Sequence, residues 1–197
     1  TAAYLLQSCH RLNPTPLNVV ISQVLNDNGL SGMGHAQIPE SGNLGLGWLY
    51  YGMARVIRPA TAVVIGSFRG FVPLMLGRAL ADNGAGKVLF LAPSLVAPFW
   101  RRPEEVLAHF AKFGVRNIEH HCLTTQEFVK SAAYQNLREV DLLFVDGYHS
   151  CEQARFDYEA FHPLLSPWGV VFFHDSIRIR PSRIYGADKV YEDRVRA

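Results

Sequence analysis

Two short stretches of the sequence place acids and histidines at the ends of apolar runs. FVDGYHS stops one apolar run at Asp146 and sets His149 three positions further on. VFFHD stops a second run at His174 and Asp175. Carboxylate oxygens bind hard divalent cations, and an imidazole beside them can act as a general base. The pattern is therefore typical of a metal-assisted site that moves a proton.

A structural role for Asp146 is the alternative. Asp146 precedes a helix that we predict to begin near Ser150, so its carboxylate could cap that helix while His149 packs against it. Considered alone, Asp146 fits a cap and a ligand equally well. Because two strand ends carry the same chemistry, we favour the functional interpretation.

Short apolar runs alternate with segments of helical periodicity from residue 61 onward. The predicted strands are TAVVIG (61–66), KVLFLA (87–92), NIEHHC (117–122), DLLFVD (141–146) and GVVFFHD (169–175). The predicted helices between them are VPLMLGRALADNG (72–84), EEVLAHFAKFG (104–114), TTQEFVKSAAYQN (124–136) and CEQARFDYEAFHPLL (151–165). Near-continuous apolar strands are typical of a parallel sheet that is covered on both faces. The alternation predicts a doubly wound α/β fold with a mostly parallel sheet.

The part of the chain before this sheet is predicted to be mostly helical. Residues 15–29 form one predicted helix, with Thr15 as its N-cap and Pro16 at its first position. Residues 44–59 form a second. The polar, glycine-rich stretch between them, residues 31–43, is either a lid or a linker.

Composition sets the broad class of the protein. The chain has 197 residues, of which 49% are hydrophobic and 18% charged, so it is long enough for one globular domain with a proper core. Within that domain we separate an N-terminal helical extension with a lid, residues 1–60, from a sheet-containing part, residues 61–197. Three cysteines without C-x-x-C spacing predict neither a disulfide framework nor a zinc ribbon, which fits the reducing cytoplasm.

Charge and hydropathy also limit the expected partners. The net charge is only +2, and no basic stripe interleaved with aromatic residues appears, which disfavours a nucleic-acid partner. No apolar run approaches the roughly 20 residues that a membrane span requires, and we expect no signal peptide. A small molecule is therefore the expected partner.

A glycine-containing turn, VVIGSFRGF, follows the first predicted strand. Gly66 and Gly70 would let the backbone approach a ligand closely and leave N–H groups at a helix N-terminus free to donate. In an open α/β sheet, ligands bind at the carboxyl ends of the strands, so this turn and Asp146 should share one crevice. The G-x-x-x-G spacing is less specific than the G-x-G-x-x-G of dinucleotide binders, and a tight turn without a ligand is the alternative.

The stretch from residue 140 to 175, VDLLFVDGYHSCEQARFDYEAFHPLLSPWGVVFFHD, resembles a known family. It looks like the fourth strand, following helix and fifth strand of class I S-adenosylmethionine-dependent methyltransferases. The likeness is strongest to small-molecule O-methyltransferases of the macrocin and cephalosporin-pathway type. VVIGSFRGF takes the place of the family's first motif, the glycine turn under the methionine part of the cofactor. The resemblance covers about residues 42–188 and implies a Rossmann-like domain that methylates a small-molecule hydroxyl.

The resemblance also implies the residues of the site. The positions that would contact S-adenosylmethionine are Gly66, Ser67, Phe68, Gly70, Ala92, Pro93, Thr124 and Asp146. The positions that would hold a divalent cation such as Mg²⁺ are Asp146, His174 and Asp175. The catalytic residues would be Asp146 and His149, because His149 stands where related catechol-type enzymes place a basic lysine. An imidazole there could accept the hydroxyl proton as the oxygen attacks the sulfonium methyl group.

The sequence departs from the family pattern at two strand ends. Val64 stands where the family usually has an acid before the glycine turn, and Ala92 replaces the acid that accepts hydrogen bonds from the ribose hydroxyls. Loss of such charge-assisted bonds typically costs about 1.5 to 3 kcal/mol each, or at least tenfold in affinity. These departures favour one alternative, a catalytically degenerate methyltransferase-like protein that binds or scaffolds. A nicotinamide oxidoreductase is a weaker one, because the glycine fingerprint is missing.

The C-terminal part is shorter than the family pattern. After His174 and Asp175 the family has a further helix and an antiparallel strand pair, for which few residues follow here. Either the segment is short, or a partner chain completes the edge of the sheet. The second alternative predicts a homo-oligomer.

Overall fold

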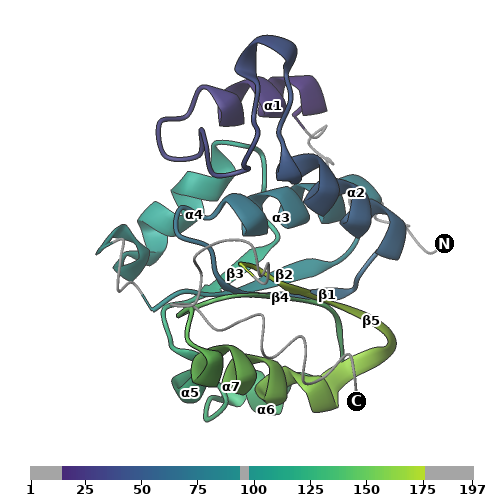
Figure 1. Cartoon of the computed structure of the whole chain (residues 1–197), viewed down its shortest axis with the longest axis vertical. Helices are drawn as coiled ribbons and strands as arrows, with labels where there is room; N and C mark the ends of the chain where they lie inside the picture. The colour runs from purple at the N-terminus through teal and green to yellow at the C-terminus, as the bar shows by residue number, and fades with distance from the viewer. Residues whose placement is uncertain (1–14, 94–97, 176–197) are drawn as a thin grey trace, which may run out of the picture.

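A five-stranded sheet forms the centre of the computed structural model, which describes residues 15–93 and 98–175 (Figure 1). The strands are β1 (Thr61–Gly66), β2 (Lys87–Leu91), β3 (Ile118–His121), β4 (Val140–Asp146) and β5 (Leu165–Phe173). Their order is β3-β2-β1-β4-β5, and every neighbouring pair is parallel. The order reverses between β1 and β4, which confirms the predicted doubly wound α/β fold.

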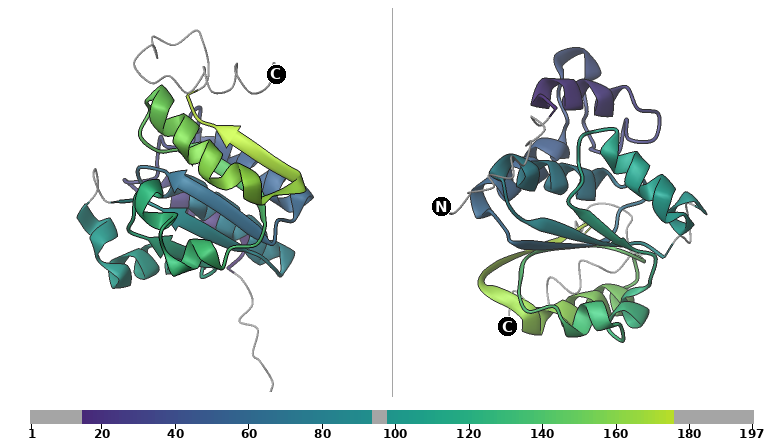
Figure 2. Two further views of the ribbon diagram at one scale, coloured as in Figure 1. Left: turned by 90° about the horizontal axis from the view of Figure 1, so that it is seen from below. Right: turned by 180° about the vertical axis from the view of Figure 1, so that it is seen from behind.

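Helices cover both faces of the sheet. On one face lie α2 (Leu46–Ile57), α3 (Phe71–Asn83) and α4 (Pro103–Ala111), with α1 (Leu17–Leu25) stacked outside them (Figures 1 and 2). On the other face lie α5 (Thr125–Phe128), α6 (Ala132–Gln135) and α7 (Cys151–Phe161). Single turns of 3-10 helix are η1 (Pro39–Ser41), η2 (Pro98–Arg101) and η3 (His162–Leu164). The left-hand view of Figure 2 shows β5 at the edge of the sheet.

The strands are apolar along their length because both of their faces are buried. Val63, Val64 and Ile65 of β1 are each at most 5% exposed. Successive side chains of a strand point to opposite faces, so Val64 belongs to the core beneath α3 while Val63 and Ile65 belong to the core beneath α7. Val20 of α1 and Tyr50 of α2 lie in the same core as Val64. The N-terminal extension is thus packed onto one face of the sheet.

Several predicted element boundaries were wrong. Pro16, not Thr15, occupies the N-cap position of α1, and no side-chain hydrogen bond caps that helix there. The helix predicted over residues 124–136 is divided into α5 and α6. Ser131 causes the division, because its hydroxyl donates to the carbonyl of Phe128 at the end of α5 and accepts from the N–H of Tyr134 in α6. A serine that hydrogen-bonds in this way starts a new helix although the apolar spacing continues.

Strand β5 also differs from its prediction. It begins four residues earlier than expected, at Leu165, and ends at Phe173, so His174 and Asp175 follow the strand. Parts of the predicted domains, residues 1–14, 94–97 and 176–197, lie outside the described residues. Within the residues that the structure describes, no helix combines the length and the apolar character needed to cross a membrane.

The predicted lid or linker is held in a defined conformation by backbone contacts. Ile38 and Asn43 form an antiparallel bridge, and the N–H of Leu46 donates to the carbonyl of Gly34 at 2.6 Å. Gly45 has a φ of 59°, and a Cβ atom there would lie 1.7 Å from the carbonyl oxygen of His35. The two ends of this segment therefore meet where only a glycine fits, which fixes the position of His35.

The carboxyl ends of β1 and β4 approach each other closely. Gly66 pairs with Asp146 in the sheet register, and its φ is 75°. A Cβ atom on Gly66 would lie only 1.9 Å from the carbonyl oxygen of Asp146. Both the conformation and the space thus require glycine at this position.

We predict that Gly66→Ala lowers the free energy of unfolding by at least about 2 kcal/mol, because the added methyl group displaces one of the two strand ends. Gly52→Ala is the matched control, since Gly52 lies inside α2 and an added methyl group there would meet no atom within 4 Å. That control should gain roughly 0.5 to 1 kcal/mol. Urea unfolding of both variants measures the difference, and equal stabilities would contradict the close approach.

Candidate active site

The carboxylate and imidazole side chains predicted for the site lie where the order of the strands reverses. Asp146 is the last residue of β4, beside the glycine turn that follows β1. In doubly wound sheets this switch point is where ligands bind. The side chain of Asp146 is 15% exposed, so it is largely enclosed but still reachable from solvent.

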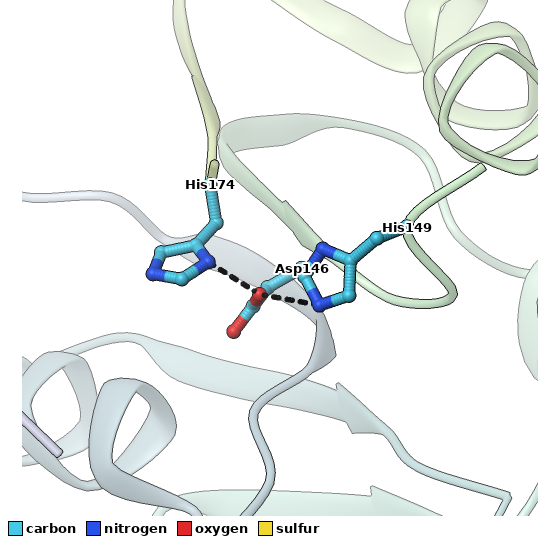
Figure 3. A group of neighbouring side chains, drawn as sticks. All are labelled: Asp146, His149 and His174. Carbon is cyan, nitrogen blue, oxygen red and sulfur yellow. Dashed lines mark ion pairs between the residues drawn. The ribbon is translucent and has the colours of Figure 1, made fainter. Parts of the chain in front are cut away.

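Two imidazoles flank this carboxylate. The Nδ1 atom of His174 lies 2.9 Å from Oδ1 of Asp146, and Nε2 of His149 lies 3.8 Å from the same oxygen. Figure 3 shows the two rings on opposite sides of that oxygen. One potential ligand atom from each of the three residues lies within 4.8 Å of the other two. The structure therefore brings together residues that the sequence placed at two separate strand ends.

Asp175 adds a second carboxylate to the group. Its Oδ2 atom lies 3.5 Å from Nδ1 of His174 and 3.8 Å from Nδ1 of His149. Its φ of 53° is uncommon for a residue other than glycine, and it turns the chain directly after β5. All four residues predicted from the two stretches thus lie in one cluster.

The helix-capping alternative for Asp146 is wrong. Ser150 occupies the N-cap position of α7, and its hydroxyl oxygen accepts a hydrogen bond of 3.1 Å from the N–H of Gln153. The carboxylate of Asp146 instead faces the imidazoles. Helix capping therefore does not account for an acid at this position.

A buried acid supports the loop that carries His149. Asp157 of α7 is 1% exposed, and its Oδ1 atom accepts a hydrogen bond of 2.7 Å from Nε2 of Gln153. Burial raises the pKa of this carboxyl group. A Cβ atom on Gly147 would lie 2.8 Å from Oδ2 of Asp157, so a larger residue after Asp146 would displace this buried carboxylate or lift the loop from α7.

The predicted cofactor turn is tight and buried. Ser67 is 8% exposed and has a φ of 121°, a strained conformation of the kind found at ligand-binding turns. Its hydroxyl accepts a hydrogen bond from the N–H of Val72 in the first turn of α3. Gly70, at the N-cap of α3, has a φ of 78°, and a Cβ atom there would lie 2.8 Å from the ring of Trp100. Phe68, between these residues, is 49% exposed.

The residues predicted to border the ribose and adenine follow β2 and β3. Among the residues that the structure describes there, Ala92, Pro93 and Thr124 offer no carboxylate. Ala92 is 7% exposed, and its N–H donates to the carbonyl of His121. Pro93 follows it and is partly exposed. The hydroxyl of Thr124 accepts from the N–H of Glu127 and donates to its side chain in a capping box that begins α5. Thr124 thus has a structural role that the sequence analysis did not assign.

Two residues of the N-terminal extension join the cluster. Nε2 of His35 lies 3.4 Å from Nε2 of His174, and the two rings stack with centroids 5.7 Å apart. Tyr50 of α2 packs edge-on against Phe144 of β4. Burial, followed by the charges of Asp146 and Asp175, raises the pKa of Tyr50 to about 12. No spacing in the sequence links these positions to the strand ends; the only signal was a histidine in the predicted lid.

Two surface hollows of about 320 and 330 Å³ lie away from the cluster. One is lined by Asp27, Gly29, Arg69, Glu105, His109 and Lys112. The other is lined by Cys151, Glu152, Arg155, Phe156 and Glu159. Neither hollow is lined by a residue that the sequence predicted for the site. The candidate site therefore lies at the carboxyl ends of the strands and not in these hollows.

Comparison with protein families identifies a domain in the chain. A family model described as a methyltransferase domain matches residues 63–176, which is more than half of the chain. A curated relative, the uncharacterized protein y4gI of Sinorhizobium fredii, is 27% identical over 146 residues. The match covers 66% of this chain, but the chain spans only about 15% of the length of that relative.

Comparison with solved structures finds the same fold. The O-methyltransferase TomG of Streptomyces achromogenes, involved in tomaymycin synthesis and solved with SAM, has a TM-score of 0.62 at 20% identity, over 91% of this chain and 84% of that one. The O-methyltransferase of Bacillus cereus, solved with SAH, has a TM-score of 0.63 at 15% identity, and the match covers 95% of this chain and 82% of that one. The SAH-bound methyltransferase PaMTH1 of Podospora anserina has a TM-score of 0.58 at 16% identity, and the match covers 87% of this chain and 80% of that one. At these identities the likeness establishes the Rossmann-like fold.

We predict that Tyr50 makes stability fall with pH above its ordinary pKa of 10. The folded protein keeps the Tyr50 proton up to about pH 12, whereas the unfolded chain releases it near pH 10. The neutral hydroxyl therefore adds to the free energy of unfolding below pH 10, and this contribution is lost as the pH rises from about 10 to about 12. Tyr50→Phe should therefore lose less stability than the wild type over this interval. Denaturant unfolding at a series of pH values measures the slopes. Tyr148→Phe, which changes a ring that is 75% exposed, is the matched control. Parallel curves for Tyr50→Phe and the wild type would contradict the prediction.

Proposed function

The chain belongs to the methyltransferase domain family, and we propose that it is an S-adenosylmethionine-dependent O-methyltransferase of a small molecule. The observation that carries this proposal is the register of β1 and β4, which puts the glycine turn directly beside Asp146 and its two imidazoles. Two of the similar structures are O-methyltransferases solved with SAM or SAH, which supports this cofactor. The macrocin and cephalosporin-pathway subtype is part of the proposal.

The glycine turn fits the methionine part of the cofactor. Gly66 and Gly70 present backbone without side chains, and the N-terminus of α3 directs N–H groups toward the carboxyl ends of the strands. Ser67 and Phe68 form the turn between them, and Ala92, Pro93 and Thr124 would border the ribose and adenine. When bound, S-adenosylmethionine supplies an electrophilic methyl group on sulfur.

The acidic end of the site fits the acceptor. His149 is positioned to take the proton from a hydroxyl group that is held beside Asp146, because its Nε2 atom already faces that carboxylate. Asp146 in turn would stabilise the imidazolium that forms. A divalent cation such as Mg²⁺, held by Asp146, His174 and Asp175, belongs to the proposal and would lower the pKa of the acceptor hydroxyl.

The ribose end supports a second candidate function. Ala92 is nearly buried at the end of β2, where it offers no carboxylate to a sugar hydroxyl. A protein that kept the fold but binds the cofactor too weakly to catalyse would serve as a binding or scaffolding module. Binding of the cofactor therefore decides between the two functions.

We predict that S-adenosylhomocysteine binds the wild-type protein in calorimetry at millimolar ligand. His149→Ala should retain this binding but lower the rate of methyl transfer from labelled S-adenosylmethionine to small hydroxyl compounds by about 10² to 10⁴-fold, as loss of a general base does. His162→Ala, which removes an exposed imidazole at the end of α7, is the matched control. Absence of binding in the wild type would refute the enzyme and leave the scaffolding function.

We also predict that Ala92→Asp tightens S-adenosylhomocysteine about tenfold, because the new carboxylate can accept charge-assisted hydrogen bonds from the ribose. Ala92→Asn is the control of similar size without the charge and should gain less. Calorimetry of the three proteins measures the affinities. Unchanged or weaker binding by Ala92→Asp, with folding intact, would show that the ribose does not lie at the end of β2.

A further inference from the structure

Each imidazole of the cluster has one nitrogen toward Asp146 and the other toward an outer residue. His149 directs Nε2 to Asp146, while its Nδ1 lies 3.8 Å from Oδ2 of Asp175. His174 directs Nδ1 to Asp146, while its Nε2 lies 3.4 Å from Nε2 of His35. In histidines that bind metal ions, the nitrogen that does not bind the metal usually donates its proton to an outer acceptor. The contact of His174 with His35 is within hydrogen-bond distance, whereas the contact of His149 with Asp175 is a longer electrostatic one.

The three inner atoms suit a small cation. Neighbouring ligands of a tetrahedral zinc ion lie about 3.4 Å apart, given metal-ligand distances of about 2.0 to 2.1 Å. The contacts of the Asp146 oxygen with the two imidazole nitrogens, at 2.9 and 3.8 Å, lie on either side of this value. One potential ligand atom of each of the three residues lies within 4.8 Å of the other two. Small adjustments of the side chains would thus place all three around one ion.

The kind of ligand atom points to the class of cation. Mg²⁺ prefers oxygen ligands, whereas imidazole nitrogen suits zinc, copper, iron or nickel, and cobalt lies between iron and nickel in the order of affinities. Two of the three inner atoms are imidazole nitrogens and only one is a carboxylate oxygen. Asp175, the other carboxylate, lies beside the nitrogens of both rings, 3.5 Å from Nδ1 of His174 and 3.8 Å from Nδ1 of His149. The geometry therefore differs from the magnesium set expected from the sequence.

His35 is held in place by the backbone around it. His35 and Ala36 have φ values of 45° and 44°, and two consecutive non-glycine residues in this left-handed region are strained. The N–H of Gly34 donates to Oε1 of Gln37, and Gly45 lies against the carbonyl of His35 where no side chain would fit. Strain of this kind persists where the surroundings fix a residue, and it is common at functional sites. The contact with His174, 139 positions away, is where this turn meets the site.

We propose that Asp146, His149 and His174 form a cation site that prefers a borderline transition ion such as Zn²⁺ or Co²⁺ to Mg²⁺. His35 is a positioning residue beside the outer nitrogen of His174. Asp175 is a positioning residue for both rings, 3.8 Å from the outer nitrogen of His149 and 3.5 Å from the inner nitrogen of His174.

This inference rests on the proposed function and changes its metal set, because His149 takes the place of Asp175 as a ligand. With an ion bound at Nε2 of His149, the ion, instead of a free imidazole, would promote deprotonation of the acceptor hydroxyl. The role of His35 makes the segment of residues 31–43 part of the site instead of a linker.

Calorimetry of the chelator-treated protein with zinc, cobalt or magnesium chloride tests the proposal. Zinc and cobalt should bind at least about 100-fold more tightly than magnesium, in a one-to-one ratio. Bound cobalt should also give the visible absorption of a site with imidazole ligands. His174→Ala should abolish both signals. Equal or tighter binding of magnesium, or no binding of zinc, would overturn the cation class.

Substitutions of His35 test its role as a positioning residue. His35→Asn and His35→Gly both tolerate the positive φ, so the fold should survive, and circular dichroism checks this. Each should weaken zinc binding by about 10 to 100-fold, as loss of an outer partner does, and should shift the cobalt spectrum. His162→Ala should change neither. Zinc affinities of the His35 variants equal to that of His162→Ala would overturn the positioning role.

The same samples separate this inference from the proposed function. S-adenosylhomocysteine is titrated into each protein with and without zinc. Binding of the cofactor product without binding of zinc would overturn the cation site and leave the methyltransferase intact. Binding of zinc at these residues without binding of S-adenosylhomocysteine would support the cation site and refute the methyltransferase.

Discussion

The close approach of Gly66 to Asp146 is the constraint on which the rest of the site depends. The two residues end neighbouring parallel strands at the point where the strand order reverses, and no side chain fits between them. The glycine turn after β1 and the acid at the end of β4 must therefore occupy the same place. Gly147 extends the constraint, because it lets the next loop rest on Asp157 and bring His149 back toward the acid.

The two ends of the proposed site differ in the number of charged and polar side chains that they present. The acidic end has two carboxylates, two imidazoles at the strand ends and a third imidazole from the N-terminal extension. The ribose end has Ala92, whose backbone is engaged with β3 and whose side chain has no polar atom. Under the proposed function, cofactor affinity would come from the turn between Gly66 and Gly70 and from the N-terminus of α3. The acceptor side of the proposed site would be bound by charge and the cofactor side mainly by backbone.

Much of the fold could be predicted because buried parallel strands must be apolar on both faces. The runs around Val64 and Phe144 therefore stood out, and the residues at their ends could be assigned to one edge of the sheet. The division of the helix at Ser131 could not, because its hydroxyl overrides an apolar spacing that continues through it. His35 and Tyr50 were missed for another reason: their contacts depend on how the extension packs, which no local pattern records.

A crystal structure of the protein with S-adenosylhomocysteine would show whether one strand register creates both halves of an active site. We predict that the sulfur of the ligand lies beside the turn from Gly66 to Gly70, facing the carboxylate of Asp146. We also predict that the ribose lies next to Ala92 without a charged partner. A ligand bound elsewhere, or its absence from the crevice at saturating concentration, would show that these strand ends do not form the cofactor site.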